Sequence, residues 1–220
     1  MTIKTAEQIA ILRAGGKRLA QILDQVIKAV KPGVTPIELD QLARELIKAG
    51  KDKPSFLGYQ PDGVPKPYPT ALCTSVNNAV VHGIPDDRPL QEGDIIGVDL
   101  GLVHEGLFTD MAKTVAVGKI SPELKKLLTQ TEQALQAGIK KVRAGNTIGD
   151  IGAAVQVVAK KHKYGVVKEL AGHGVGLAVH EEPKIPNYGK AGTGVKLQAG
   201  MVIAIEPMFN LGTGNVIFMD

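Results

Sequence analysis

Apolar residues recur every three or four positions in the first thirty residues of the chain, which is the spacing of one face of a helix. This pattern predicts a helix from Thr5 to Val30, with apolar positions at Ile9, Leu12, Leu19, Ile22, Leu23, Val26 and Ile27. A second long helix is predicted from Ser121 to Val142, because Ser121-Pro122-Glu123 is typical of a helix start.

Between these helices the pattern changes to the alternation of strands. Residues 95–117 are predicted to form a hairpin with its turn near Val103-His104-Glu105-Gly106. A turn centred between His104 and Glu105 sets Asp99 opposite Asp110, with their Cβ atoms roughly 4.5–5.5 Å apart. Two carboxylates this close are stable together only when one is protonated or when a cation lies between them.

Successive side chains of a strand point to opposite faces of the sheet. In the first strand of the hairpin, this alternation puts Asp99 on the face away from the core. Val98 and Leu100 are predicted to point inward. Gly97 and Gly101 share the face of Asp99, and we expect them to leave space over its carboxylate.

The two halves of the chain resemble each other. Residues 30–39 resemble residues 142–151, and in each copy a threonine, Thr35 or Thr147, precedes a predicted helix with an acidic residue three positions later. This is the pattern of a helix N-cap with a capping box.

A second pair of segments extends the repeat. Residues 92–99 resemble residues 199–206, so Asp99 and Glu206 occupy equivalent positions. In the first copy a partner strand follows, whereas in the second the chain ends at Asp220 before such a strand is complete. We therefore expect the final strand to be missing and the chain to be truncated at its C-terminus.

The order helix, helix, strands in both copies predicts an α+β fold with pseudo-twofold symmetry. The expected organisation is a single domain over residues 1–220, built from pseudo-repeats at about 5–118 and 119–220. A curved antiparallel sheet would carry the helices on its outer face, and the site would lie where the halves meet.

Composition narrows the class of protein. The chain has 220 residues, 44% of them apolar, which is enough for a substantial core. A single cysteine, Cys73, fits a reducing compartment. No signal-peptide pattern and no apolar run of membrane-spanning length is present. A cytoplasmic protein without membrane contact is expected.

The net charge of +4 raises the question of a nucleic-acid partner. Solvated helix faces are the favoured interpretation, because the lysine pairs fall on predicted amphipathic helices without interleaved aromatic residues; docking on an RNA-rich surface such as the ribosome is the alternative. The pairs are Lys125-Lys126, Lys140-Lys141 and Lys160-Lys161.

Three histidines have neighbours that suit a functional role. His173 lies between two glycines, where an ion or a substrate can approach its imidazole, and His180 and His82 have similar settings. Each of them alone is as compatible with a histidine in a flexible turn. His104 and His162 are expected to be solvated and are given no role.

Six short motifs spread over the chain are weak individually and specific together: Val81-His82-Gly83-Ile84-Pro85, Val98-Asp99, Thr109-Asp110, Gly172-His173-Gly174, His180-Glu181-Glu182-Pro183 and Ile205-Glu206-Pro207-Met208. With this set the chain resembles the type I methionine aminopeptidases from Ile3 to Asp220. The resemblance implies the pita-bread fold and a hydrolase that removes the initiator methionine from nascent proteins with a small second residue.

The resemblance also implies roles for single residues. Asp99, Asp110, His173 and Glu206 match metal ligands for two divalent ions, with Mn, Fe or Co expected. A metal-bridged hydroxide would attack the peptide bond. Glu206 would take the proton released in this step and pass it to the leaving amine. A fifth ligand, a glutamate on the family's final strand, would lie beyond Asp220, which leaves the activity of the chain as written open.

The remaining implied roles concern the substrate. His180 matches the histidine that contacts the scissile peptide, and His82 matches the one near the substrate amine. Tyr68 and Cys73 align with positions of the methionine pocket, and Tyr59 is a further candidate to line it. The implied partners are methionyl peptides and nascent chains, with transient ribosome contact, and a monomer is expected.

Three alternatives remain. A proline-specific aminopeptidase shares the fold and the ligand set but usually carries an additional amino-terminal domain. A metal-free binding protein with the same fold would fit the missing fifth ligand and the basic charge. A structural domain with surface carboxylates is the third, and the predicted pairing of Asp99 with Asp110 argues against it.

Overall fold

The computed structural model describes residues 2–218, and the chain divides into two compact units. The N-terminal unit contains Ala6–Ser121 and Gly176–Val179, and the C-terminal unit contains Pro122–Val175 with residues 2–5 and 180–218. The boundary after Ser121 falls close to the predicted boundary between the pseudo-repeats, and the single domain stays a prediction.

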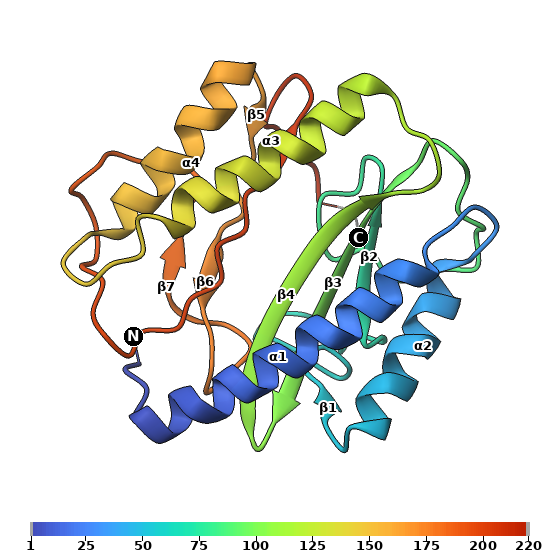
Figure 1. Ribbon diagram of the computed structural model, residues 1–220, viewed down its shortest axis with the longest axis horizontal. Helices are drawn as coiled ribbons and strands as arrows, with labels where there is room; N and C mark the ends of the chain where they lie inside the picture. Colours follow the sequence, from blue (N-terminus) through green and yellow to red (C-terminus); the bar gives the residue numbers. More distant parts are fainter. Residues whose placement is uncertain (1, 219–220) are drawn as a thin grey trace. The chain divides into compact units, whose positions relative to one another are not determined.

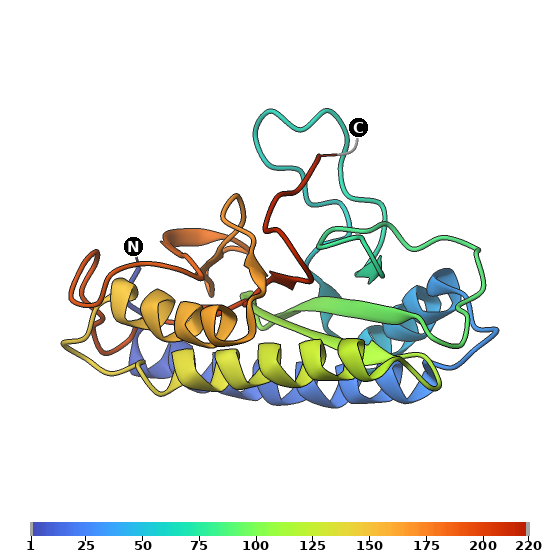
Figure 2. The same ribbon diagram turned by 90° about the horizontal axis from the view of Figure 1, so that it is seen from above.

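A central strand organises the N-terminal unit. Its elements are α1 (Ala6–Ala29), α2 (Pro36–Ala49), β1 (Lys53–Pro54), β2 (Leu72–Val76), β3 (Ile95–His104) and β4 (Leu107–Ala116). β1 and β2 pair with one edge of β3 and β4 pairs with the other, and every pair is antiparallel. α1 and α2 lie on one side of this sheet, and the loop between β1 and β2 rises on the other (Figures 1 and 2).

The core of this unit lies between the sheet and its two helices. Ile96, Val98, Leu100 and Leu102 alternate along β3 and are fully buried, as the parity of the strand predicts. They pack against apolar residues of the helices: Leu19, Ile22, Leu23, Val26, Leu39, Ala43 and Ile47. The opposite face of β3 is therefore the one that carries Asp99.

The helix starts predicted from sequence are confirmed. In α2, Thr35 Oγ1 accepts from the Glu38 backbone N–H, while the Glu38 carboxylate accepts from the Thr35 backbone N–H. Thr147 and Asp150 form the same capping box in α4. The first predicted helix is α1, with one residue fewer at each end.

The C-terminal unit repeats the order of helix, helix and strands, as predicted. Its elements are α3 (Pro122–Ile139), α4 (Ile148–His162), β5 (Gly165–Val166), β6 (Gly172–Gly174), β7 (Glu181–Ile185) and β8 (Phe209–Asn210). α3 and α4 lie side by side (Figure 1), and β6 pairs with β7 and β5 with β8 in short antiparallel sheets. The final strand expected after Asp220, like Met219 and Asp220 themselves, lies outside the described residues.

All six lysines of the pairs are exposed, in agreement with the solvated interpretation. Lys125-Lys126 lies on α3 and Lys160-Lys161 on α4, whereas the prediction that Lys140-Lys141 lies on a helix is wrong, because α3 ends at Ile139, three residues before the predicted end at Val142. Among the described residues, no helix combines the length and the apolar character needed to cross a membrane.

Candidate metal centre and substrate-binding cluster

The hairpin that carries two of the candidate ligands has a different register from the predicted one. Its turn residues are Glu105 and Gly106, both with positive φ (49° and 80°), and His104 pairs with Leu107. Positive φ at both central residues is characteristic of the two-residue turn that matches strand twist. The turn is centred one residue later than predicted.

This register separates Asp99 and Asp110. Asp99 lies opposite Ala112 and Asp110 opposite Gly101, so the prediction of a directly opposed pair is wrong. The two aspartates are diagonal neighbours on one face of the hairpin, where Cβ atoms are typically about 7 Å apart. That separation weakens their mutual repulsion, and both carboxylates still point to the same side of the sheet.

The glycines beside Asp99 do not leave the space that was expected. A Cβ on Gly101 would lie 1.8 Å from Ser55 Oγ and 2.8 Å from Phe56 Cε1, so protein atoms already fill that position. A Cβ on Gly97 would be 3.6 Å from its nearest neighbours, in ordinary contact. Gly101 is needed because Ser55 and Phe56 approach the backbone of β3.

An aromatic cluster lies on the Asp99 side of the sheet. Cys73 of β2 is directly opposite Asp99 of β3. Around it gather the other members of what we call the aromatic cluster: Phe56, Tyr59, Tyr68, Phe108 and Val179. The structure thus brings together the three residues predicted to line a methionine pocket, while sequence reasoning missed Phe56, Phe108 and Val179, which no periodic pattern distinguishes from core residues.

Two polar groups in the aromatic cluster are kept neutral by their surroundings. Burial raises the pKa of the Cys73 thiol well above its usual range, and the nearby Asp99 carboxylate raises it further. Burial likewise raises the pKa of the Tyr68 hydroxyl. Cys73 is therefore a small apolar wall residue at neutral pH and not a nucleophile.

Tyr68 also links the aromatic cluster to the loop that carries His82. Its hydroxyl is 2.9 Å from the Gly83 carbonyl oxygen and 3.2 Å from that of Leu72. The Gly83 carbonyl accepts from the Thr74 backbone N–H at 2.8 Å, which fixes the loop to β2. His82 is exposed on this loop and has a positive φ of 58°.

In the C-terminal unit, His173 and Glu206 form a contact that suits a cation. His173 is buried in β6, and its Nδ1 is 2.8 Å from the Gly174 carbonyl oxygen. A carbonyl oxygen only accepts, so Nδ1 carries the proton and Nε2 of the neutral ring presents a lone pair. That Nε2 is 3.3 Å from Glu206 Oε1. Two electron-pair donors side by side fit a shared metal ion or a protonated imidazole.

The backbone around Glu206 is extended but is not the regular strand that the repeat predicted. Its segment pairs with β6 through a single bridge between Gly174 and Ile203, and the Ala204 N–H donates to the His173 carbonyl at 2.7 Å. Asn187, 1% exposed, donates from Nδ2 to the Glu206 carbonyl oxygen at 2.7 Å. Sequence reasoning gave Asn187 no role, because nothing in its local pattern indicates this contact.

His180 is exposed and lies beside His173. The two ring centroids are 4.4 Å apart with an interplanar angle of 80°. The structure therefore brings together His173, His180 and Glu206 in the C-terminal unit. The other predicted residues, Asp99, Asp110, His82 and the aromatic cluster, belong to the N-terminal unit.

The expectation that His104 is solvated is wrong. Its side chain is 17% exposed, and Nδ1 is 2.8 Å from Asp52 Oδ1. Arg18 Nε binds the other oxygen of Asp52 at 2.6 Å. As an even-numbered residue of β3, His104 points to the helix side of the sheet, where this network fixes the start of β1 to α1.

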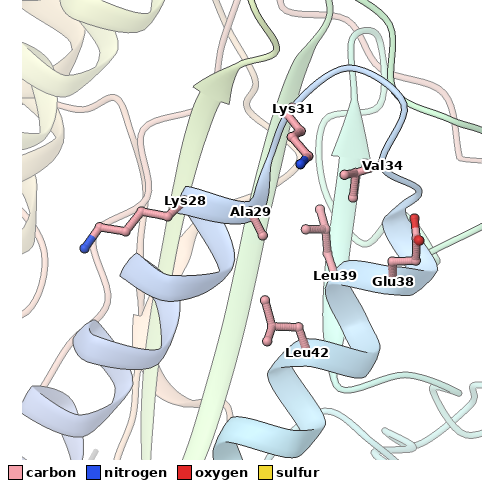
Figure 3. A pocket seen from close by; sticks show the side chains of 7 residues that line it. All are labelled: Lys28, Ala29, Lys31, Val34, Glu38, Leu39 and Leu42. Atoms are coloured by element: carbon pink, nitrogen blue, oxygen red, sulfur yellow. The ribbon is translucent and has the colours of Figure 1, made fainter.

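One surface pocket lies away from all predicted site residues. It is formed where the end of α1 meets the start of α2 (Figure 3), and it is lined by Lys28, Ala29, Lys31, Val34, Glu38, Leu39 and Leu42. Glu38 already serves the capping box there, and none of the predicted site residues lines this pocket, so it is not the candidate site.

Comparison with known proteins gives matches over almost the whole chain. A model of metallopeptidase family M24 matches residues 10–219. The methionine aminopeptidase of Clostridium acetobutylicum is 44% identical over 212 residues, which cover 96% of this chain and 82% of that protein. The crystal structure of methionine aminopeptidase from Rickettsia prowazekii has a TM-score of 0.94 at 39% identity, covering 99% of this chain and 85% of that one.

A more distant structural match bears on the proline-specific alternative. The Xaa-Pro dipeptidase from Bacillus anthracis has a TM-score of 0.78 at 23% identity, and 56% of its length is covered. At this identity the likeness shows only the shared fold, the pita-bread fold that the motifs implied.

Proposed function

The chain belongs to metallopeptidase family M24, and on this premise we propose that it removes the N-terminal methionine from peptides and nascent proteins whose second residue is small. The proposal rests most on the near-full-length similarity to proteins named methionine aminopeptidase. The aromatic cluster beside Asp99 supports it, because an apolar, uncharged wall suits a thioether side chain.

Membership of this family implies divalent metal ions. We propose two ions, with Mn, Fe or Co preferred, held by Asp99, Asp110, His173 and Glu206. Asp110, His173 and Glu206 each offer one atom able to bind a metal, and a set of carboxylates with one imidazole suits these metals better than a structural zinc site. Bound ions would supply an activated water and would polarise the scissile carbonyl.

The protein's own residues would do the rest. Glu206 is proposed to take a proton from the attacking water and to pass it to the leaving amine. His180, exposed beside His173, would donate to the oxygen that gains charge in the transition state. His82 would lie near the substrate amine, and the aromatic cluster with Tyr59, Tyr68 and Cys73 would hold the methionine side chain.

The proposed setting is the cytoplasm, with a monomer acting on nascent chains. Exposed lysines on α3 and α4 are compatible with transient contact with the ribosome. The single buried thiol of Cys73 suits a reducing compartment.

The test is release of methionine from a Met-Gly-type peptide, with and without added Mn or Co. His180→Ala should lower kcat while metal occupancy is retained, and an exposed-lysine variant, Lys48→Met, serves as the matched control. Loss of metal in parallel with activity would make His180 a ligand instead. No release by a folded, metal-loaded protein would favour the noncatalytic binding alternative.

A further inference from the structure

A buried ion pair lies next to His180 in the C-terminal unit. Lys4 Nζ is 2.7 Å from Glu181 Oε2, and the two side chains are 1% and 8% exposed. Lys4 Nζ also donates to Thr2 Oγ1 at 2.7 Å, and Thr2 Oγ1 donates to the same oxygen of Glu181. Burying two charges carries a desolvation cost that their attraction does not always repay, so this pair is weak evidence for stability alone.

The segment that carries Lys4 is held closely against its own unit. The Lys4 backbone N–H donates to the Gly200 carbonyl at 2.8 Å. Gly200 has a φ of +88°, and a Cβ there would lie 2.7 Å from Ile3 Cγ2 and 2.9 Å from the Lys4 carbonyl oxygen. Residues 2–5 thus fit into the turn that begins the extended segment leading to Glu206.

Glu181 makes two contacts that fix the backbone next to His180. It is the first residue of β7 and pairs with Gly174 of β6, which directly follows His173. Its side chain binds Lys4 Nζ at 2.7 Å. His180 directly precedes Glu181, and its ring contacts that of His173, with centroids 4.4 Å apart. The position from which its side chain starts therefore depends on the backbone at residues 180 and 181.

We propose that Lys4 is a positioning residue for His180 and acts through Glu181; this rests on the proposed function, in which His180 contacts the reacting peptide. The Lys4 ammonium holds the Glu181 carboxylate in place and thereby sets the direction of the His180 imidazole. Without the ammonium, the buried carboxylate must either move toward water or take up a proton. Either change alters the anchor beside His180, and the imidazole then meets the substrate oxygen at the wrong angle.

The experiment compares Lys4→Met, Glu181→Gln, the double variant Lys4→Met with Glu181→Met, and Lys48→Met as a control on the exposed face of α2. Each protein is measured for kcat and KM on a Met-Gly-type peptide and for metal content. The imidazole of His180 is also followed by NMR in ¹⁵N-histidine-labelled, metal-free protein, with its signal assigned by His180→Gln. The double variant keeps a folded protein in the comparison, because replacing both charges of a buried pair by apolar groups is often neutral for stability.

The positioning role predicts that Lys4→Met lowers kcat roughly 10- to 100-fold, with KM and metal content close to the parent values. The His180 signal should shift in Lys4→Met and in the double variant, and kcat should stay low in both. Lys48→Met should match the parent throughout. A double variant with parental kcat and an unchanged His180 signal would overturn the proposal and leave the ion pair a structural role only.

The same measurements separate this proposal from the proposed function. If the parent releases no methionine, the proposed function fails, and the NMR signal alone decides whether Lys4 orients His180. If the parent is active, His180→Ala is inactive and Lys4→Met is unaffected, only the role of Lys4 is refuted.

Discussion

Replacing Gly101 by alanine should destabilise the N-terminal unit, whereas the same change at Gly97 should not. The two glycines lie on one face of β3, on either side of Asp99. At Gly101 the new Cβ would meet Ser55 Oγ at 1.8 Å and Phe56 Cε1 at 2.8 Å, whereas at Gly97 the nearest atoms are 3.6 Å away. Gly97→Ala is therefore a matched control that makes the same chemical change without the clash.

The expected change in the free energy of unfolding is the balance of two opposing effects. Forcing an extra carbon into a packed site costs about 1–3 kcal/mol, and Ser55 and Phe56 are only 8% and 7% exposed, so neither can swing freely into solvent. Removing a strand glycine gains about 0.5–1 kcal/mol by restricting the unfolded chain. Gly101→Ala should thus lose up to about 2.5 kcal/mol net, Gly97→Ala should be neutral or slightly stabilised, and the two variants should differ by about 1–3 kcal/mol.

Urea unfolding of the metal-free proteins measures this difference, because metal binding then adds nothing to the native state. The midpoint should fall for Gly101→Ala with an unchanged m-value. Phe56 must also move, so KM for a methionyl peptide should rise in the same variant. Equal midpoints for the two alanine variants would refute the packing argument.

Three further predictions concern single residues. Backbone and side-chain hydrogen bonds from the N-cap threonine of α4 lower the pKa of Asp150, so its contribution to stability exists above its unfolded pKa, about 3.9, and disappears as pH falls through the lower folded value. Asp150→Asn should accordingly be less stable than the parent at pH 6 in thermal unfolding, and the difference should narrow as pH falls below about 3.9; a gap that stays constant from pH 6 into acid would contradict this. Cys73 should react with iodoacetamide at pH 8 far more slowly than a free thiol, and faster in Asp99→Asn, because burial and then Asp99 raise its pKa; a rate equal to that of free cysteine would contradict this. Asn187→Leu removes the donor to the Glu206 carbonyl and should weaken metal affinity roughly 10- to 100-fold in a competition titration, while an unchanged affinity would leave Asn187 a packing role.

The helices and the inward face of β3 could be predicted because their signals are local. Apolar spacing and the Thr35 and Thr147 capping boxes depend on residues within one or two turns of each other. The hairpin register could not be predicted as securely, since moving the turn by one residue shifts every cross-strand pair by two. Only the backbone conformation of Glu105 and Gly106 decides between the two registers.

In the site, too, local motifs could be predicted from the sequence and long-range contacts could not. Motifs identified the histidines and carboxylates, and the structure brings His173, His180 and Glu206 together within one unit. The supporting contacts escaped sequence reasoning, because Asn187 and Lys4 reach their partners across 19 and 177 residues. Such contacts depend on tertiary packing, which leaves no periodic trace in the sequence.

The Tyr68 hydroxyl has a consequence for attempts to change which amino acid the enzyme accepts. Because this hydroxyl reaches the carbonyl of Gly83, a residue that lines the proposed side-chain subsite also supports the loop that would recognise the substrate amine. Redesign at Tyr68 would therefore alter side-chain preference and amine recognition together. Phe108, which contributes only a hydrocarbon surface to the aromatic cluster, is the better first position for broadening the substrate range.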